Sequence, residues 1–229
     1  MALPGIIGGT SFHSTIDLYR FVNQAVYEAK GGYNCARLLL CNVNLQDILD
    51  QDTPAKKGGV LAEAAKRLEA GGATCFAVCS NGLHEYVPYA EKEVSIPLLH
   101  IADPTIAAIR ARGFTRIGLM GAKDTMVHDF YKQRLIDAGI DVIIPSEPEM
   151  DYMESVLWGE TNFGIVKPES AARFLQIAGQ LYEAGAQGVI LGCTEIGMLI
   201  KQEDTEIPLF DTTQLHAQAI ADLCIKEDS

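Results

Sequence analysis

Short runs rich in leucine and β-branched residues alternate along this chain with longer segments in which apolar residues recur at every third or fourth position. The short runs predict buried strands, and the longer spacing predicts amphipathic helices. The expected strands are residues 5–7, 37–43, 75–79, 98–101, 116–120, 141–145, 188–191 and 209–210. The expected helices are one that begins near residue 14 and those at residues 61–69, 104–112, 126–138, 170–184 and 213–224. Strands that alternate with helices in this way are typical of an α/β fold with parallel sheets.

The chain repeats part of its own pattern at about half its length. Residues 5–9 resemble residues 118–122 at an offset of 113, and the Ile-Pro-Leu of residues 96–98 recurs at residues 207–209 at an offset of 111. A fixed period of this kind indicates that one structural unit occurs twice. The repeat therefore predicts two similar α/β lobes with parallel sheets, related by a pseudo-two-fold axis.

The same repeat predicts the domain organisation and the place of the active site. One lobe is expected to comprise residues 1–103 and 208–229, and the other residues 104–207. Open α/β sheets bind ligands at the carboxyl ends of their strands. Two facing lobes would direct matching strand ends into one cleft, so the active site is expected there.

Charge and cysteine content exclude several classes of partner. The chain has 30 Asp and Glu residues against 18 Lys and Arg, which gives a formal net charge of −12. Such a charge repels nucleic acid and acidic membrane surfaces, and no apolar run is long enough to cross a bilayer. The six cysteines lack Cys-x-x-Cys spacing and lie mostly in apolar runs, as buried thiols of a reducing compartment do. We expect a cytoplasmic protein that binds neither nucleic acid nor membranes.

The sequence also lacks the common signatures of cofactor and metal sites. No Gly-x-Gly-x-x-Gly follows an expected strand, and no phosphate-binding Gly-x-x-x-x-Gly-Lys-Ser/Thr occurs. His13, His100 and His128 show no metal-ligand spacing with one another or with cysteines. We therefore expect no cofactor and no metal.

Reactive side chains follow equivalent strands of the two repeats. Cys193 follows Gly192 at a strand end, where backbone N–H groups and a helix dipole are expected to lower the pKa of its thiol. The matching strand of the first repeat runs into Cys79 and Ser80. An offset of 113 pairs Ser80 with Cys193, whereas an offset of 114 pairs Cys79 with it. Successive side chains of a strand point to opposite faces, so only one of these two neighbours can point into the cleft.

Five motifs, in order along the chain, resemble those of the aspartate/glutamate racemase superfamily, whose amino-acid racemases work without pyridoxal phosphate. They are Gly8-Gly9-Thr10-Ser11, Asn42-Val43-Asn44, Gly121-Ala122-Lys123-Asp124-Thr125-Met126, Leu191-Gly192-Cys193-Thr194-Glu195-Ile196 and Asp211-Thr212-Thr213. In the superfamily's first-lobe motif, Cys or Thr followed by Asn-Thr-x-His, the matching residues are Asn81 and His84. This match favours the register that places Ser80 opposite Cys193. The resemblance implies the two-lobed fold, a cofactor-independent isomerase and a homodimer.

The resemblance implies that Cys193 and Ser80 occupy the two catalytic acid/base positions. Ser80 stands where a cysteine or threonine is usual, and Gly82 stands where a threonine is usual. Racemisation through a carbanion needs one group to remove the Cα proton and a second to deliver a proton on the other face. A hydroxyl is a far weaker acid than a thiol, so Ser80 suggests a one-sided or slow enzyme.

A second set of residues is expected to bind the substrate. The resemblance implies contacts from Asn81, Gly82 and Thr194 to its α-carboxylate. Residues 10 and 11 follow loop glycines near a helix start, which suits a carboxylate but also a plain turn capped by Ser14. Lys167 is a candidate partner for a distal carboxylate, or simply a lysine near a helix start. The expected substrate-binding set is Thr10, Ser11, Asn44, Asn81, Gly82, Lys167 and Thr194.

Three functions follow from this set. The leading hypothesis is a racemase or epimerase of an acidic amino acid such as aspartate or glutamate, with a small dicarboxylate or amino acid as substrate. A decarboxylase or isomerase that uses Cys193 alone needs a proton donor on only one face, which Ser80 permits. The third is a catalytically weak binder of small molecules.

The segment with Tyr152, Trp158 and Phe163, rich in acidic residues and glycine, is expected to form a covering loop or an oligomer contact.

Overall fold

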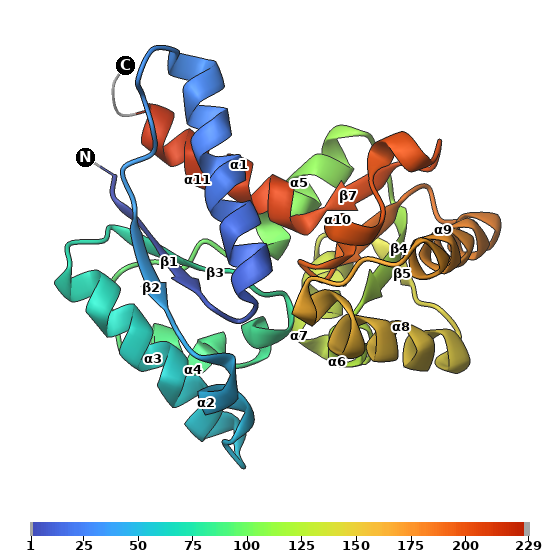
Figure 1. Cartoon of the computed structure of the whole chain (residues 1–229), viewed down its shortest axis with the longest axis horizontal. Coiled ribbons are helices and arrows are strands. Elements are labelled where there is room, and N and C mark those ends of the chain that lie inside the picture. Colours follow the sequence, from blue (N-terminus) through green and yellow to red (C-terminus); the bar gives the residue numbers. More distant parts are fainter. Residues whose placement is uncertain (1, 227–229) are drawn as a thin grey trace. The chain divides into compact units, whose positions relative to one another are not determined.

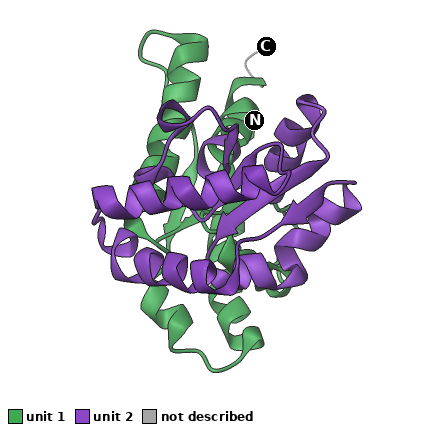
Figure 2. Ribbon diagram, turned by 90° about the vertical axis from the view of Figure 1, so that its right-hand side faces the viewer, with its two compact units in different colours: residues 1–101, 216–229 green, residues 102–215 purple. Residues whose placement is uncertain are grey.

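The computed structural model describes residues 2–226, which fold into two compact units of helices and parallel strands. Unit 1 comprises residues 1–101 and 216–229, and unit 2 comprises residues 102–215 (Figure 2). Within the described range, no helix is long and apolar enough to span a membrane.

Unit 1 is built on a sheet of three parallel strands in the order β2-β1-β3 (Figure 1). Its strands are β1 (Pro4–Gly8), β2 (Leu39–Asn42) and β3 (Cys75–Val78). Its helices are α1 (Phe12–Lys30), α2 (Leu45–Leu49), α3 (Pro54–Ala70), the 3₁₀ turn η1 (Gly82–Glu85) and α4 (Val87–Glu91).

Unit 2 is built on a sheet of four parallel strands in the order β5-β4-β6-β7. Its strands are β4 (Arg116–Gly121), β5 (Asp141–Ile143), β6 (Val189–Gly192) and β7 (Leu209–Asp211). Its helices are α5 (Ala102–Ala111), α6 (Lys123–Val127), α7 (Asp129–Asp137), α8 (Glu147–Gly159), α9 (Pro168–Glu183), α10 (Ile196–Leu199) and the 3₁₀ turns η2 (Thr161–Phe163) and η3 (Gln202–Asp204). The last helix, α11 (Thr212–Lys226), starts in unit 2 and continues into unit 1.

The two sheets share one strand register, which confirms the predicted repeat and the α/β fold class. Ile7 pairs with Val78 in unit 1, and in unit 2 Met120 pairs with Leu191, each 113 positions further along the chain. Beyond β3, Leu98 forms a bridge to Phe76 at the place where β7 pairs with β6. The pairing of β7 with β6 also groups residues 208–215 with unit 2.

The strand expected at residues 98–101 is wrong beyond its first residue. Phe76 and Leu98 form only an isolated bridge. Pro97 has no N–H to donate to a ladder, and the N–H of Ile101 donates instead to the His84 imidazole at 3.3 Å. Helix α5 then begins at Ala102, so the chain leaves the sheet after a single bridge.

The expected covering loop around Tyr152 and Trp158 is also wrong, because these residues lie in helix α8. Ser146 and Glu149 form a capping box at its start, and Pro148 occupies the first turn. This start signal outweighs the acidic residues and glycines, which are also typical of loops. The helix expected at residues 126–138 is interrupted at His128, whose extended backbone (φ −76°, ψ 159°) separates α6 from α7.

Two apolar layers cover the two faces of the sheet in unit 1. The direction in which each side chain of β3 points decides which layer it joins. One layer packs Ile7, Phe76 and Val78 with α3 and α4. The other packs Ala77 and Cys79 with α1 and α11. This alternation along β3 is the period of two that a strand imposes, so the thiol of Cys79, 1% exposed, lies in the core.

Candidate functional site

The loop after β1 is tied to the end of β3 by a buried hydrogen bond. The Thr10 hydroxyl donates to the Cys79 carbonyl oxygen at 2.7 Å. Ser11 is the N-cap of α1, and its hydroxyl accepts the N–H of Ser14 at 3.5 Å. The cap is therefore Ser11, not Ser14, and both candidate residues 10 and 11 shape the loop at this helix start.

The same loop depends on a glycine. Gly9 has φ of 89°, and a Cβ there would lie 2.0 Å from the Val43 carbonyl oxygen. Only a residue without a side chain permits this close approach between the loops after β1 and β2.

We expect Gly9→Ala to lower the free energy of unfolding by at least about 2 kcal/mol, because it adds both left-handed strain and a backbone clash. Gly72→Ala is the matched control, since Gly72 has φ of 91° but nothing within 4 Å of its added Cβ. It carries only the strain, about 1 kcal/mol. Urea unfolding of both variants measures the difference, and equal losses would show that the contact with Val43 is unimportant.

Asn44 serves as the N-cap of α2 and is exposed. Its carboxamide oxygen accepts the N–H of Gln46 at 3.4 Å, and its amide donates to Asp47 at 2.9 Å. These bonds engage its side chain within its own turn, so the structure gives Asn44 a structural role.

Ser80 lies immediately after β3 and is partly exposed. Its hydroxyl oxygen accepts the N–H of Leu83 at 3.3 Å, which closes the turn leading into η1. Asn81 is buried, and Gly82 begins η1. The three candidate residues 80–82 therefore form one tight turn at a carboxyl strand end, the usual position of ligand sites in such sheets.

His84 holds this turn through the backbone of Ser80. Its Nε2 accepts the N–H of Ile101, so Nδ1 carries the proton and donates to the Ser80 carbonyl oxygen at 2.6 Å. The ring also packs against that of His100, with centroids 4.3 Å apart. Since both ring nitrogens bind backbone groups, His84 positions the loop rather than activating the Ser80 hydroxyl.

In unit 2, Cys193 follows β6 directly and donates its S–H to a buried carboxylate. The distance from its Sγ to Glu195 Oε2 is 2.9 Å, and the Thr194 hydroxyl donates to the same oxygen at 2.9 Å. Glu195 is 5% exposed. The arrangement keeps the sulfur protonated, with its proton directed at a carboxylate.

The expected lowering of the Cys193 pKa is wrong. Burial, the charge of Glu195 and the hydrogen bond to it raise the pKa of the Cys193 thiol well above its usual range, and Glu154 adds to the effect. Helix α10 has only four residues, and its dipole does not offset a carboxylate in direct contact. At neutral pH the resting group is a thiol, which donates a proton and does not accept one.

We expect Glu195→Gln to speed alkylation of Cys193 several-fold at pH 8, because loss of the negative charge lowers the thiol pKa and increases the thiolate fraction. Glu154→Gln should act in the same direction but less, and the exposed Glu203→Gln should have no effect. The measurement is the iodoacetamide rate against pH, followed by mass spectrometry of the peptide that contains Cys193. An unchanged profile in Glu195→Gln would contradict this account of the raised pKa.

The strand register shows which residues correspond between the units. Continued past the strand ends, the constant offset of 113 pairs Ser80 with Cys193, not Cys79. It also pairs Gly82 with Glu195. The turn of unit 1 therefore has neither the thiol nor the carboxylate of its counterpart.

The Lys167 side chain forms an ion pair within unit 2. Its ammonium lies 2.9 Å from Glu160 Oε1, and the Ser170 hydroxyl donates to Glu160 Oε2 at 2.7 Å. The bond to Glu160 raises the pKa of Lys167, so it stays a cation. A substrate carboxylate at Lys167 would have to compete with Glu160.

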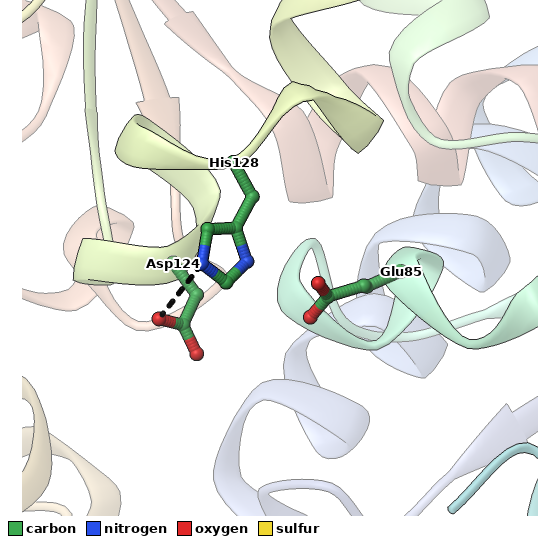
Figure 3. Close-up of side chains that lie close together, drawn as sticks. All are labelled: Glu85, Asp124 and His128. Atoms are coloured by element: carbon green, nitrogen blue, oxygen red, sulfur yellow. Dashed lines mark ion pairs between the residues drawn. The ribbon is translucent and has the colours of Figure 1, made fainter. Parts of the chain in front are cut away.

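The loop after β4 carries further charged groups that the sequence reading did not assign. The backbone N–H of Lys123 donates to Glu154 Oε2 at 2.7 Å, and its ammonium pairs with Asp151. In the same segment the His128 imidazole lies 3.9 Å from Asp124 (Figure 3). Glu154 was missed because the sequence pattern did not predict helix α8, which carries it. Glu195 was visible in the motif that contains Cys193, but its contact with the thiol depends on a side-chain direction.

A comparison with known families matches residues 7–220 to the model described as Asp/Glu/Hydantoin racemase. The chain belongs to this racemase family. A Yersinia pestis protein ascribed to the Asp/Glu racemases is 36% identical, with a TM-score of 0.90 over 98% of this chain and 100% of the other. An aspartate racemase homologue from Pyrococcus horikoshii OT3 is 30% identical, with a TM-score of 0.84 over 98% and 99% of the two chains.

A curated relative extends the comparison within the family. The broad specificity amino-acid racemase RacX of Bacillus subtilis (strain 168) is 24% identical over 174 residues, which cover 75% of this chain and 72% of RacX. The family model also includes hydantoin racemases. Membership therefore shows an isomerase of the racemase type and leaves the substrate to be argued from the site.

Proposed function

We propose that this protein is a cofactor-independent racemase of an acidic amino acid such as aspartate or glutamate, with Cys193 as one acid/base and Ser80 as the other. The observation that carries the proposal is the pairing of these two residues by the shared register of β3 and β6 in a chain of the racemase family. Each follows a strand at its carboxyl end, where α/β sheets bind ligands.

The reaction needs a proton to leave Cα on one face and another to arrive on the other. The protonated thiol of Cys193, held toward Glu195, is suited to deliver a proton to a carbanion. Ser80 then stands on the removing side, where a hydroxyl gives little alkoxide near neutrality. In the reverse direction Cys193 must first lose its proton, which the adjacent carboxylate disfavours. We therefore expect a slow enzyme.

The turns at the strand ends supply polar groups for the rest of the substrate. We assign the α-carboxylate to the turn of Asn81 and Gly82 with Thr194, and place Thr10, Ser11 and Asn44 next to it. Lys167 is the proposed partner of the distal carboxylate. A substrate anion there would replace Glu160 as the acceptor of the Lys167 ammonium.

One observation favours a second function, a decarboxylase or isomerase that uses Cys193 alone. The thiol is held protonated by Glu195, and among residues 2–226 no side-chain base bonds to the hydroxyl of its counterpart Ser80. A one-sided proton donor of this kind is sufficient when the carbanion forms by loss of carbon dioxide.

Incubation of the protein with L- and D-aspartate, L- and D-glutamate and a malonate in deuterium oxide tests the proposal. Racemisation with deuterium at Cα supports the racemase. Exchange with retained configuration, or release of carbon dioxide, supports the one-sided alternative. No change in any of them would leave a weak binder and contradict both activities. We further propose a homodimer, which light scattering after gel filtration tests.

A further inference from the structure

Unit 2 contains a pocket of about 190 Å³ beside the edge strand β7. Its apolar lining includes the buried Leu191, Ile200 and Phe210 and the half-buried Leu209 and Leu215. Cys193 and Thr194 do not line it. This volume is small beside the roughly 300–1,000 Å³ of pockets for drug-sized ligands, so it suits a ligand of few atoms.

Two cationic side chains that pair with no carboxylate of the described residues line this pocket. The Arg112 guanidinium lies over the Phe210 ring, 5.6 Å from its centroid, and no described residue accepts a hydrogen bond from it. The ammonium of Lys201 likewise has no acceptor among residues 2–226. Several other cations of unit 2 are paired with acids, including Arg116, Arg134 and Arg173. In a chain with 30 acidic residues, two unpaired cations in one pocket indicate a place for an anion from outside.

The acidic residue that lines the pocket is already bonded within its own segment. Asp211 Oδ1 accepts the N–H groups of Thr213 and Gln214 at 2.8 and 3.2 Å, and its Oδ2 accepts the Gln214 side-chain amide at 3.1 Å. It caps the start of α11, where the helix dipole offsets its charge. The pocket lining thus carries two cations and one carboxylate.

We propose that this pocket binds a small carboxylate with a branched apolar group, at a site separate from Cys193. The carboxylate pairs with Arg112, whose planar N–H donors match its two oxygens, and with Lys201. The apolar group packs on the half-buried Leu209 and Leu215, which a plain inorganic anion would leave uncovered. Both halves of the ligand contribute, so neither charge nor apolar area alone gives full affinity.

The test is calorimetric titration of the Cys193→Ala protein with 3-methylbutanoate, which removes turnover and leaves the pocket intact. We expect binding that weakens about tenfold or more in Arg112→Gln and in Lys201→Gln, because each loses a charge-assisted contact. Lys132→Gln, a lysine on α7 outside the pocket, is the matched control and should bind normally.

Two further probes distinguish the parts of the ligand. The neutral 3-methylbutanamide should bind at least tenfold more weakly than the carboxylate, and inorganic phosphate should also bind more weakly because it lacks the apolar group. Equal affinity for phosphate, no loss in the Arg112 and Lys201 variants, or no binding at millimolar concentration would each overturn the proposal. None of these results bears on racemisation, which is measured separately in the protein that retains Cys193.

Discussion

Replacement of Cys193 by alanine is expected to reduce racemisation by about 10²–10⁴-fold, the usual contribution of a general acid or base. The thiol lies at the carboxyl end of β6, and Glu195 holds it protonated. The measurement is the rate of change of optical rotation with each enantiomer of aspartate, together with deuterium exchange at Cα.

A second thiol variant serves as the control for this result. Cys75→Ala removes a partly buried thiol at the start of β3, at the opposite end of the strand from Ser80, and should leave the rate unchanged. Full activity in Cys193→Ala, with its fold shown intact by circular dichroism, would mean that another group transfers the proton.

The Ser80→Cys variant is expected to raise racemisation by about 10²–10⁴-fold, or to create it. Its register counterpart Cys193 is a thiol, and a second thiol would supply a base whose pKa lies several units nearer neutrality than that of a hydroxyl. Unit 1 has no carboxylate at the position of Glu195, because Gly82 stands there. The new thiol should therefore ionise more readily than Cys193 and act mainly as the base.

Cys79→Ala is the matched control for Ser80→Cys. Its thiol packs between α1 and α11 in the core of unit 1, so its removal should cost stability and leave the rate per folded molecule unchanged. An inactive Cys79→Ala with a neutral Ser80→Cys would contradict the register assignment. A wild-type enzyme that is already fast, and unchanged in Ser80→Cys, would show that serine carries the proton well.

The repeat was predictable because short motifs recur along the sequence at the same spacing that relates the strands in the fold. Residues 5–9 and 118–122 share an offset of 113, and the hydrogen-bond register of β1 with β3 and of β4 with β6 preserves it. The offset therefore decides between Ser80 and Cys79 once it is known to be constant from one strand to the next. The sequence alone could not decide whether Ser80 or Cys79 is the counterpart of Cys193, because a single insertion between strands would change the pairing.

The electrostatics of the site were less predictable than its position. The location of Cys193 after a strand was correct, yet the sign of its pKa shift depends on where the Glu195 carboxylate points and how much water reaches the sulfur. Helix α8, which carries Glu154, was missed because its acidic and glycine residues are also typical of loops. Side-chain direction and burial are tertiary properties, which spacing along the chain does not contain.

The division of unit 1 into residues 1–101 and 216–229 has a consequence for how the chain folds as it is made. Ala217, Ile220 and Ala221 of α11 complete the layer that covers α1 and the back of the sheet, and His216 bonds to the Leu99 carbonyl oxygen. These residues are synthesised after all of unit 2. Unit 1 is thus completed only after unit 2 has been made, and a chain stalled before α11 would expose the apolar faces of Leu18, Val22 and Val26.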